Sequence, residues 1–129
     1  MRPAAHQRKE NPIMANLIGI NRIALLPGVM EEDFEQFMTE ELFPAARALS
    51  RGVRSDAHYL LKDYRGNRGD KYLWLMVLEH FGAEDRVPDA IPEVFEEIYS
   101  EVREKLQRFG IRTSFSMFTE LSRMGPPLL

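Results

Sequence analysis

The side chains best suited to moving protons near neutral pH are the histidines. The chain has three of them, and His58 and His80 fall within stretches whose apolar pattern predicts strands. Both are candidate catalytic residues, with a structural or surface role as the alternative. Two histidines without a third ligand at a suitable spacing do not predict a metal site, so no metal is expected.

Two polar residues interrupt an otherwise apolar stretch at 17–26. Because neighbours on a strand point to opposite faces, Asn21 and Arg22 are expected on different sides of a sheet. A buried polar group has to be paired, so both are candidate ligand-binding residues, Asn21 through a hydrogen bond and Arg22 as an anion anchor. The alternative is pairing within the protein, for example an ion pair of Arg22 with Glu79 or Glu120.

Aromatic residues are the remaining ligand-binding candidates. Tyr72 and Trp74 alternate on the stretch 71–81, and Tyr59 lies on the stretch before it. Such side chains either line a flat pocket for an aromatic compound or pack across strands in the core. Trp74 is the strongest candidate for a cavity wall, because a large aromatic side chain in a central strand either fills the core or borders a void.

The segment DYRGNRGDKY at 63–72 is rich in glycine and basic residues. A phosphate-binding loop requires a helix N-terminus directly after it, whereas an apolar strand pattern follows this segment. Its Arg-Gly-Asp tripeptide is an adhesion motif only outside the cell. Gly66, Asn67 and Gly69 tolerate the positive φ of a tight turn, so the segment is expected to reverse the chain between two antiparallel strands.

Composition narrows the class of protein. A chain of 129 residues fits one domain, expected at 15–123 with tails at 1–14 and 124–129. The net charge of −3 argues against nucleic acids and anionic membranes as partners. The absence of cysteine excludes disulfides, thiolate catalysis and cysteine-based metal sites. No apolar run reaches the roughly 18–20 residues of a membrane helix, and no signal-peptide core is recognisable, so a cytoplasmic location is expected.

Apolar periodicity predicts six elements. Strand patterns occur at 17–26, 54–63, 71–81 and 111–121, and helical spacing occurs at 31–49 and 91–109. Pro44 lies inside the first helix and should kink it or split off its last turn. The order β-α-β-β-α-β is that of a ferredoxin-like α+β fold, a four-stranded antiparallel sheet with both helices on one face. The first and third strands are expected at its centre.

The third predicted strand is apolar on both of its faces. Alternate residues place Tyr72, Trp74, Met76 and Leu78 on one face and Leu73, Leu75 and Val77 on the other. An antiparallel sheet with helices on one side should be polar on the other. The second apolar face therefore predicts a cover, most simply a second copy of the chain in a two-fold homodimer. The alternative is a central strand shielded by long neighbouring side chains.

These features together resemble the dimeric α/β-barrel superfamily, which includes antibiotic-biosynthesis-monooxygenase-like, stress-responsive and EthD-like domains. The resemblance rests on the element order, on Pro27-Gly28 after the first strand, on the acidic helix start and on the two-faced strand. It implies a homodimer whose two sheets face each other. It also implies a small-molecule cavity between sheet and helices in each subunit.

The resemblance implies a range of functions. Members include cofactor-free oxygenases and isomerases, which hold polyphenolic substrates with residues similar in kind to Asn21 and Trp74. Haem-degrading members carry a histidine on the second helix, and 91–109 has none, so no cofactor is expected. The expected activity is a cofactor-independent oxygenase or isomerase acting on a small aromatic compound. The alternative is a non-catalytic ligand-binding or stress-related dimer, because a fold does not by itself select a reaction.

RNA-recognition modules share this strand order and have to be considered. They stack bases on exposed aromatic residues of both central strands. The stretch 17–26 has no aromatic residue, and 71–81 lacks the glycine–aromatic motif of those modules. RNA is therefore not an expected partner.

Overall fold

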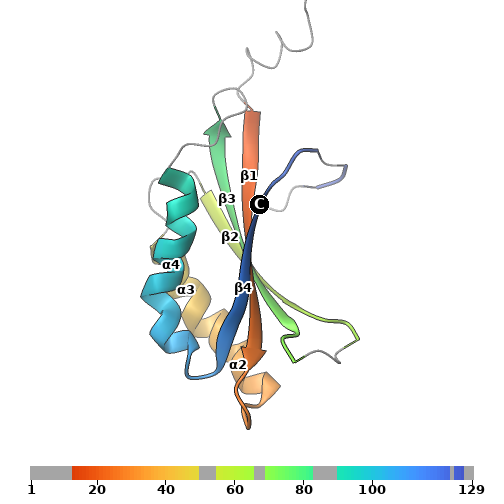
Figure 1. Ribbon diagram of the computed structural model, residues 1–129. Helices are drawn as coiled ribbons and strands as arrows, with labels where there is room; N and C mark the ends of the chain where they lie inside the picture. The colour runs from red at the N-terminus through yellow and green to blue at the C-terminus, as the bar shows by residue number, and fades with distance from the viewer. Residues whose placement is uncertain (1–12, 50–54, 66–68, 83–89, 123, 127–129) are drawn as a thin grey trace, which may run out of the picture.

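Four strands form one antiparallel sheet in the computed structural model, which describes residues 13–49, 55–65, 69–82, 90–122 and 124–126 (Figure 1). The strands are β1 (Ile13–Leu25), β2 (Ser55–Lys62), β3 (Tyr72–Gly82) and β4 (Gly110–Thr119). Their order in the sheet is β2-β3-β1-β4, so the first and third strands are central, as predicted. β1 starts four residues before the predicted strand because its pairing with β3 continues to Ile13 opposite Gly82.

The helices α2 (Glu31–Phe37), α3 (Phe43–Ala48) and α4 (Ala90–Leu106) all lie on one face of this sheet (Figure 1). The α+β class and the antiparallel sheet are therefore confirmed, in an arrangement consistent with a ferredoxin-like fold. No helix among the described residues is long and apolar enough to cross a membrane.

One π-helical turn, Met38–Leu42, joins α2 to α3. The backbone N–H of Phe43 donates to the carbonyl of Met38, five residues back. Pro44 follows at the start of α3 and has no N–H to donate. A regular α-helix here would bring the proline ring against the carbonyl four residues earlier, and the wider turn relieves that contact. The sequence predicted an interruption at Pro44, and the structure places it in the five residues Met38–Leu42.

The core fills the space between the helices and one face of the sheet. The sheet contributes Leu17, Ile23, Tyr72, Trp74, Met76 and Leu78. The helices contribute Phe34, Phe37, Met38, Leu42, Phe95, Ile98, Val102 and Leu106, among others. All of these side chains are 3% exposed or less, so the face of β3 that carries Trp74 packs against the helices.

The opposite face of the sheet is apolar as well, and we call it the open face. The pairing of the strands places on it Ile18, Ile20, Ala57, Tyr59, Leu61, Leu73, Leu75, Val77 and Phe118. Within the described ranges no helix packs on this face, and none of these side chains belongs to the core cluster. Leu61 and Phe118 are 44% and 53% exposed, whereas Val77 on the same face is fully buried. The prediction that β3 is apolar on both faces is therefore confirmed.

The connection at 63–72 reverses the chain between β2 and β3, as predicted. The N–H of Asp63 donates to the carbonyl of Lys71 at 2.7 Å, and the side chain of Asp63 accepts the N–H of Arg65 at 2.9 Å. Among the described glycines only Gly28 and Gly125 have positive φ, so Gly69 does not use the freedom that the sequence suggested. Gly66 and Asn67 lie outside the described residues.

Candidate functional site

His58 and Trp74 meet on the helix-facing side of the sheet. His58 lies on β2, and Trp74 lies on β3 opposite the next inward-facing residue of β2, Leu60. The Nε1–H of the fully buried Trp74 donates to Nδ1 of His58 at 3.1 Å. Because an indole nitrogen only donates, Nδ1 of His58 has to be unprotonated. In the neutral ring the proton is therefore on Nε2, so this edge of His58 is a hydrogen-bond donor.

A hollow opens beside His58 between β2 and the helices. Its volume is about 300 Å³, and the residues lining it are Thr39, Phe43, Pro44, Arg47 and His58. The ring of Phe43 stacks against the ring of His58, with centroids 5.5 Å apart and an angle of 29° between the planes. Thr39 comes from the π-helical turn, and Phe43, Pro44 and Arg47 from α3. The helix interruption at Pro44 thus shapes the wall of this hollow.

The lining of the hollow combines flat apolar walls with two donor groups. Phe43 and Pro44 are the apolar residues of the lining, His58 carries a ring N–H and Arg47 a guanidinium, and the hydroxyl of Thr39 donates to the carbonyl of Glu35. This combination fits a small planar compound that carries an acceptor oxygen or a negative charge. Among the side chains that the structure describes, the lining includes no carboxylate.

Asn21 is fully buried and is paired within the protein. Its Nδ2 donates to the carbonyl of Trp74 at 3.2 Å, and its Oδ1 accepts from Nη1 of Arg112 at 3.1 Å. Arg112 also forms a two-pronged ion pair with Glu96, at 3.1 and 3.2 Å, and lies 3.7 Å from the ring centre of Tyr99. These contacts tie β1 and β4 to α4. In the structure, Asn21 is therefore paired within the protein, which was the alternative to a contact with a ligand.

Arg22 lies on the open face, opposite to Asn21. Its Nη1 donates to the backbone carbonyl of Asp70 at 3.3 Å, close to the β2–β3 connection. Glu120, suggested as an ion-pair partner, lies at the far end of β1, where it accepts from Nδ2 of Asn16 at 2.9 Å. The side chain of Glu79, the other suggested partner, is outside the described part of the structure.

Tyr72 is a core residue with a polar tip. Its ring packs edge-on against Phe34, with ring centres 4.8 Å apart, and its hydroxyl donates to Oε2 of Glu35 on α2. Burial, followed by the hydrogen bond to Glu35, raises the pKa of Tyr72. Tyr72 therefore holds α2 against β3.

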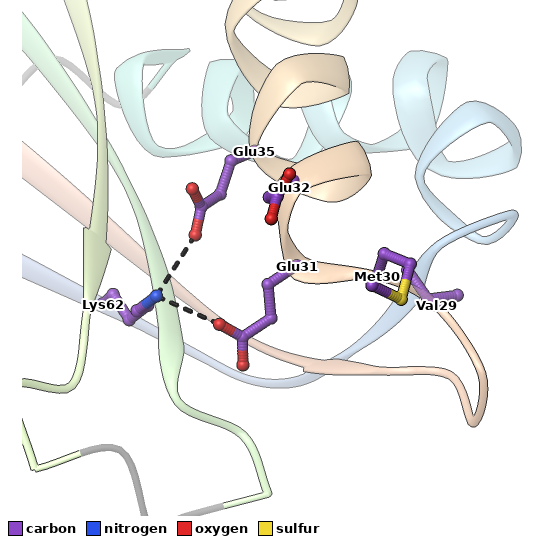
Figure 2. A pocket seen from close by; sticks show the side chains of 6 residues that line it. All are labelled: Val29, Met30, Glu31, Glu32, Glu35 and Lys62. Carbon is purple, nitrogen blue, oxygen red and sulfur yellow. Dashed lines mark hydrogen bonds and ion pairs between the residues drawn. The ribbon is translucent and has the colours of Figure 1, made fainter.

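Figure 2 shows a second hollow, of about 420 Å³, at the start of α2. Its lining residues are Val29, Met30, Glu31, Glu32, Glu35 and Lys62. Glu31 and Glu35, one turn apart, both point to Nζ of Lys62, which is 3.0 and 3.4 Å from their carboxylates. Lys71 also pairs with Glu31. The hydrogen bonds from Lys71 and Lys62 lower the pKa of Glu31, and the bond to Glu31 raises the pKa of Lys62.

The structure brings together some of the residues that the sequence singled out. His58 and Trp74 are in contact, and Asn21 hydrogen-bonds the backbone of Trp74. Neither of the two hollows has Asn21 or Trp74 in its lining. Arg22 lies on the other face, and nothing is described of the His80 side chain. The ligand-binding and catalytic roles of these residues stay predictions.

Sequence reasoning missed several residues of these sites. Phe43 and Arg47 occupy helical positions next to Pro44 without a recognisable motif. Glu31 and Glu35 were not among the candidate residues, yet they reach Lys62 of β2. Their spacing of four residues on one helix face was the available signal. The sequence contains no such signal for Arg112, because only the register of β4 against β1 places this residue over Asn21.

Comparison with models of known protein families, with curated proteins and with solved structures finds no match to this chain. Among the described residues, no group of three histidine, aspartate or glutamate side chains could hold a metal ion.

Proposed function

We propose that the protein is a homodimer in which each subunit binds a small aromatic compound in the hollow beside His58 and acts on it as a cofactor-independent isomerase. The observation that carries this proposal is the hydrogen bond from the buried Trp74 indole to Nδ1 of His58. It fixes one tautomer and holds the ring at the edge of a hollow. His58 is thereby a preorganised donor for an oxygen of the bound compound.

The chemistry follows from that donor. When a proton leaves a carbon next to a carbonyl and passes to water, negative charge moves to the oxygen. A neutral imidazole N–H aimed at that oxygen stabilises the charge as it develops. Return of a proton to another carbon of the same compound completes an isomerisation, which consumes no further reactant. Arg47, in the same lining, adds positive charge.

A non-catalytic ligand-binding dimer is the second candidate. It is favoured by one observation, that the described side chains lining the hollow include no carboxylate to act as a general base. In this case His58 and Arg47 only orient the ligand. Oxygenation, the other expected reaction, requires dioxygen in addition to the same deprotonation step.

The homodimer is supported by the open face. Its nine apolar side chains come from all four strands; Val77 is already buried in the single chain, and the described helices lie on the other face of the sheet. An apolar area that extends over a whole sheet typically marks an interface. The same face of a second copy is an equally shaped apolar cover, as in an isologous dimer.

The ligand site can be tested through the single tryptophan of the chain. Its one indole N–H signal in a ¹H–¹⁵N spectrum should shift saturably when 1-hydroxy-2-naphthoate, a planar anionic probe, is added. The affinity for the probe, taken from the concentration dependence of this shift, should fall at least tenfold in His58→Asn and in Arg47→Ala. His58→Asn keeps an acceptor for Trp74 but lacks the Nε2 donor. Arg103→Ala on the exposed side of α4 is the matched control. An unchanged signal in the wild type, or equal binding by His58→Asn, would contradict the proposed site.

Activity separates the two candidate functions. Exchange of an acidic C–H of a bound enolisable aromatic ketone in D₂O should be faster with wild type than with His58→Asn. Binding without accelerated exchange would favour the non-catalytic alternative.

A further inference from the structure

The hydrogen bond between Trp74 and His58 depends on a neutral imidazole ring. The indole nitrogen of Trp74 donates and cannot accept, so Nδ1 of His58 has to carry a lone pair. An imidazolium carries a proton on both of its nitrogens. Protonation of His58 would therefore set two N–H donors against each other across 3.1 Å. The charged form of His58 is incompatible with the position that its ring has in the structure.

Of these two rings, that of His58 is the one that can move. Trp74 is fully buried in the core, and its backbone carbonyl accepts from Asn21. His58 is only half-buried and borders the hollow beside β2. The ring stacked on it, that of Phe43, is half-buried as well. A protonated His58 can therefore turn away from Trp74 toward the solvent, whereas Trp74 stays in place without its acceptor.

The charged residues next to His58 in the described elements belong to α3 and β2. Arg47 on α3 lines the same hollow, and its charge opposes a second positive charge there. Asp56 precedes His58 by two residues on β2, about 7 Å along the strand, and its side chain is outside the described part of the structure. Lys62, four residues after His58, is paired with two glutamates of α2. The facing residues of β3 and of the π-helical turn are uncharged: Trp74, Met76 and Thr39.

These neighbours act in opposite directions on a proton at His58. A carboxylate two positions along the strand favours the charged ring, and the guanidinium of Arg47 disfavours it. The N–H of Trp74 is in direct contact with Nδ1 and opposes the proton more strongly than a charge at that separation favours it. His58 is therefore expected to take up its proton at a lower pH than the histidine of an unfolded chain.

Ligand binding in the hollow depends on the same ring position. The ligand of the proposed function accepts from the Nε2–H of His58, which the bond from Trp74 to Nδ1 holds at the edge of the hollow. When the ring leaves Trp74, Nε2 leaves that place as well, and Phe43 loses the ring on which it stacks. The hollow then keeps Arg47 but loses its positioned donor.

On the basis of the proposed ligand site, we propose that acidification empties this site: His58 takes up a proton from water, its bond to Trp74 breaks, and the bound compound is released unchanged. A histidine of the unfolded chain is protonated near pH 6.5, so the release begins somewhat below about pH 6.5. The pKa of Glu31 at the start of α2 is lowered from 4.5, so this carboxylate titrates in a separate, more acidic range.

The direction of the pH effect separates this mechanism from simple charge attraction. If the ring stayed in place, an anionic ligand would bind the imidazolium more tightly than the neutral imidazole, and its affinity would rise on acidification. If the ring is displaced, the affinity falls. The probe 1-hydroxy-2-naphthoate is suitable, because a carboxyl group ordinarily titrates near pH 4 and is largely ionised down to about pH 5.

The first measurement follows the bond in the protein without ligand, through the indole N–H signal of the single tryptophan. Between about pH 7.5 and pH 5 this signal should move in one step in the wild type. It should stay in place in His58→Asn, whose side-chain oxygen accepts at any pH, with His58→Gln as a second variant. Arg47→Ala should shift the midpoint to higher pH, because one positive charge is removed. Circular dichroism checks that each protein stays folded.

The second measurement is the dissociation constant of the probe at the two ends of this range. It should rise at least about threefold from pH 7.5 to pH 5 in the wild type and change less than about twofold in His58→Asn. An indole signal that does not move, or an affinity that is constant or rises on acidification, would overturn the proposed release. Absence of binding at pH 7.5 would overturn the ligand site itself, and the indole titration would still decide whether a proton on His58 breaks its bond to Trp74.

Discussion

At the scale of single residues, the pair of His58 and Trp74 combines stability with a prospective role in binding. Trp74 is fully buried, and its indole N–H has an acceptor in Nδ1 of His58. A buried donor that loses its acceptor costs more than the bond itself contributes. The hydrogen bond that pairs the buried indole of Trp74 thus also places the proton of the neutral His58 ring on Nε2. This is the edge that we propose contacts a ligand.

Removing the acceptor should destabilise the fold. His58→Phe keeps a ring against Phe43 but leaves the Trp74 N–H unpaired, at a cost of about 1–3 kcal/mol in the free energy of unfolding. His58→Asn should cost less, because its side-chain oxygen can accept near the position of Nδ1. Urea denaturation followed by circular dichroism measures both values. Equal stability of His58→Phe and wild type would contradict the hydrogen bond.

Tyr72 should resist ionisation. Burial and the Glu35 carboxylate raise its pKa above the ordinary value of 10.0, so in the folded protein it stays protonated where the unfolded chain begins to lose that proton. The raised pKa of Tyr72 therefore contributes stability below about pH 10, and this contribution is lost as the pH rises through the folded-state value. Absorbance titration tests this, since wild type and Tyr72→Phe should give the same tyrosinate signal until alkaline unfolding. A larger signal from the wild type near pH 10 would show that Tyr72 ionises normally.

The sequence predicted part of this residue-level arrangement. Strand parity was sufficient to place Trp74 and Tyr72 on one face and Arg22 opposite Asn21. It did not predict that His58 accepts from Trp74, because that contact depends on the register of β2 against β3. Nor did it predict Arg112 over Asn21, which depends on a register shift in the β1–β4 pairing between Arg22 and Ile23.

At the scale of elements, close packing of α4 on the sheet depends on Gly19. A Cβ at this position would lie 2.9 Å from Cδ1 of Phe95 and 3.1 Å from Cε1 of Phe115. Phe95 is fully buried on α4, so its ring has little room to move. The helix can approach β1 because that strand carries no side chain at this point.

Gly19→Ala should therefore loosen the contact between α4 and the sheet. Overpacking a dense core costs about 1–3 kcal/mol, which should appear as a lower urea midpoint. Gly69→Ala is the matched control, because a Cβ there would meet nothing within 4 Å. If both substitutions have the same effect, the contact with Phe95 does not limit this site.

The start of α2 is held to the sheet by charges that depend on pH. Lys71 and Lys62 lower the pKa of Glu31 from its ordinary value of 4.5. Its contribution to stability is therefore present above about pH 4.5 and is lost as the pH falls through the lowered folded-state value. Glu31→Gln should lower stability at neutral pH and flatten its decline between about pH 5 and pH 3.

A matched control sits next to Glu31 on the same helix. Glu32 makes none of these ion pairs, so Glu32→Gln should follow the wild-type acid profile. Thermal unfolding at a series of pH values measures all three proteins. A Glu31→Gln profile as steep as that of the wild type would contradict the role of this carboxylate.

Element boundaries show where sequence reasoning was limited. The helix interruption followed from Pro44, because proline lacks a donor, but the sequence contains no signal for a π-helical turn rather than a kink. The early start of β1 was missed because Asn16 breaks the apolar pattern. In the structure its side chain is paired with Glu120, so a polar residue is accommodated within the strand.

At the scale of the whole molecule, the account rests on a sheet with two apolar faces. The helices cover one face, and the proposed partner subunit would cover the open face. The sequence was sufficient to predict both faces of β3 from alternation alone. The contact between Asn16 and Glu120 at one end of the open face could not be predicted, because it requires the register of β1 against β4 and the path of the chain after β4.

The most direct test of the account is sedimentation equilibrium of the wild-type protein at micromolar concentration. The homodimer predicts a mass twice that of the chain, which is 15.0 kDa. Dilution should then reveal a reversible equilibrium with the single chain. A protein that sediments at 15.0 kDa throughout the micromolar range would contradict the dimer and leave the open face without its proposed cover.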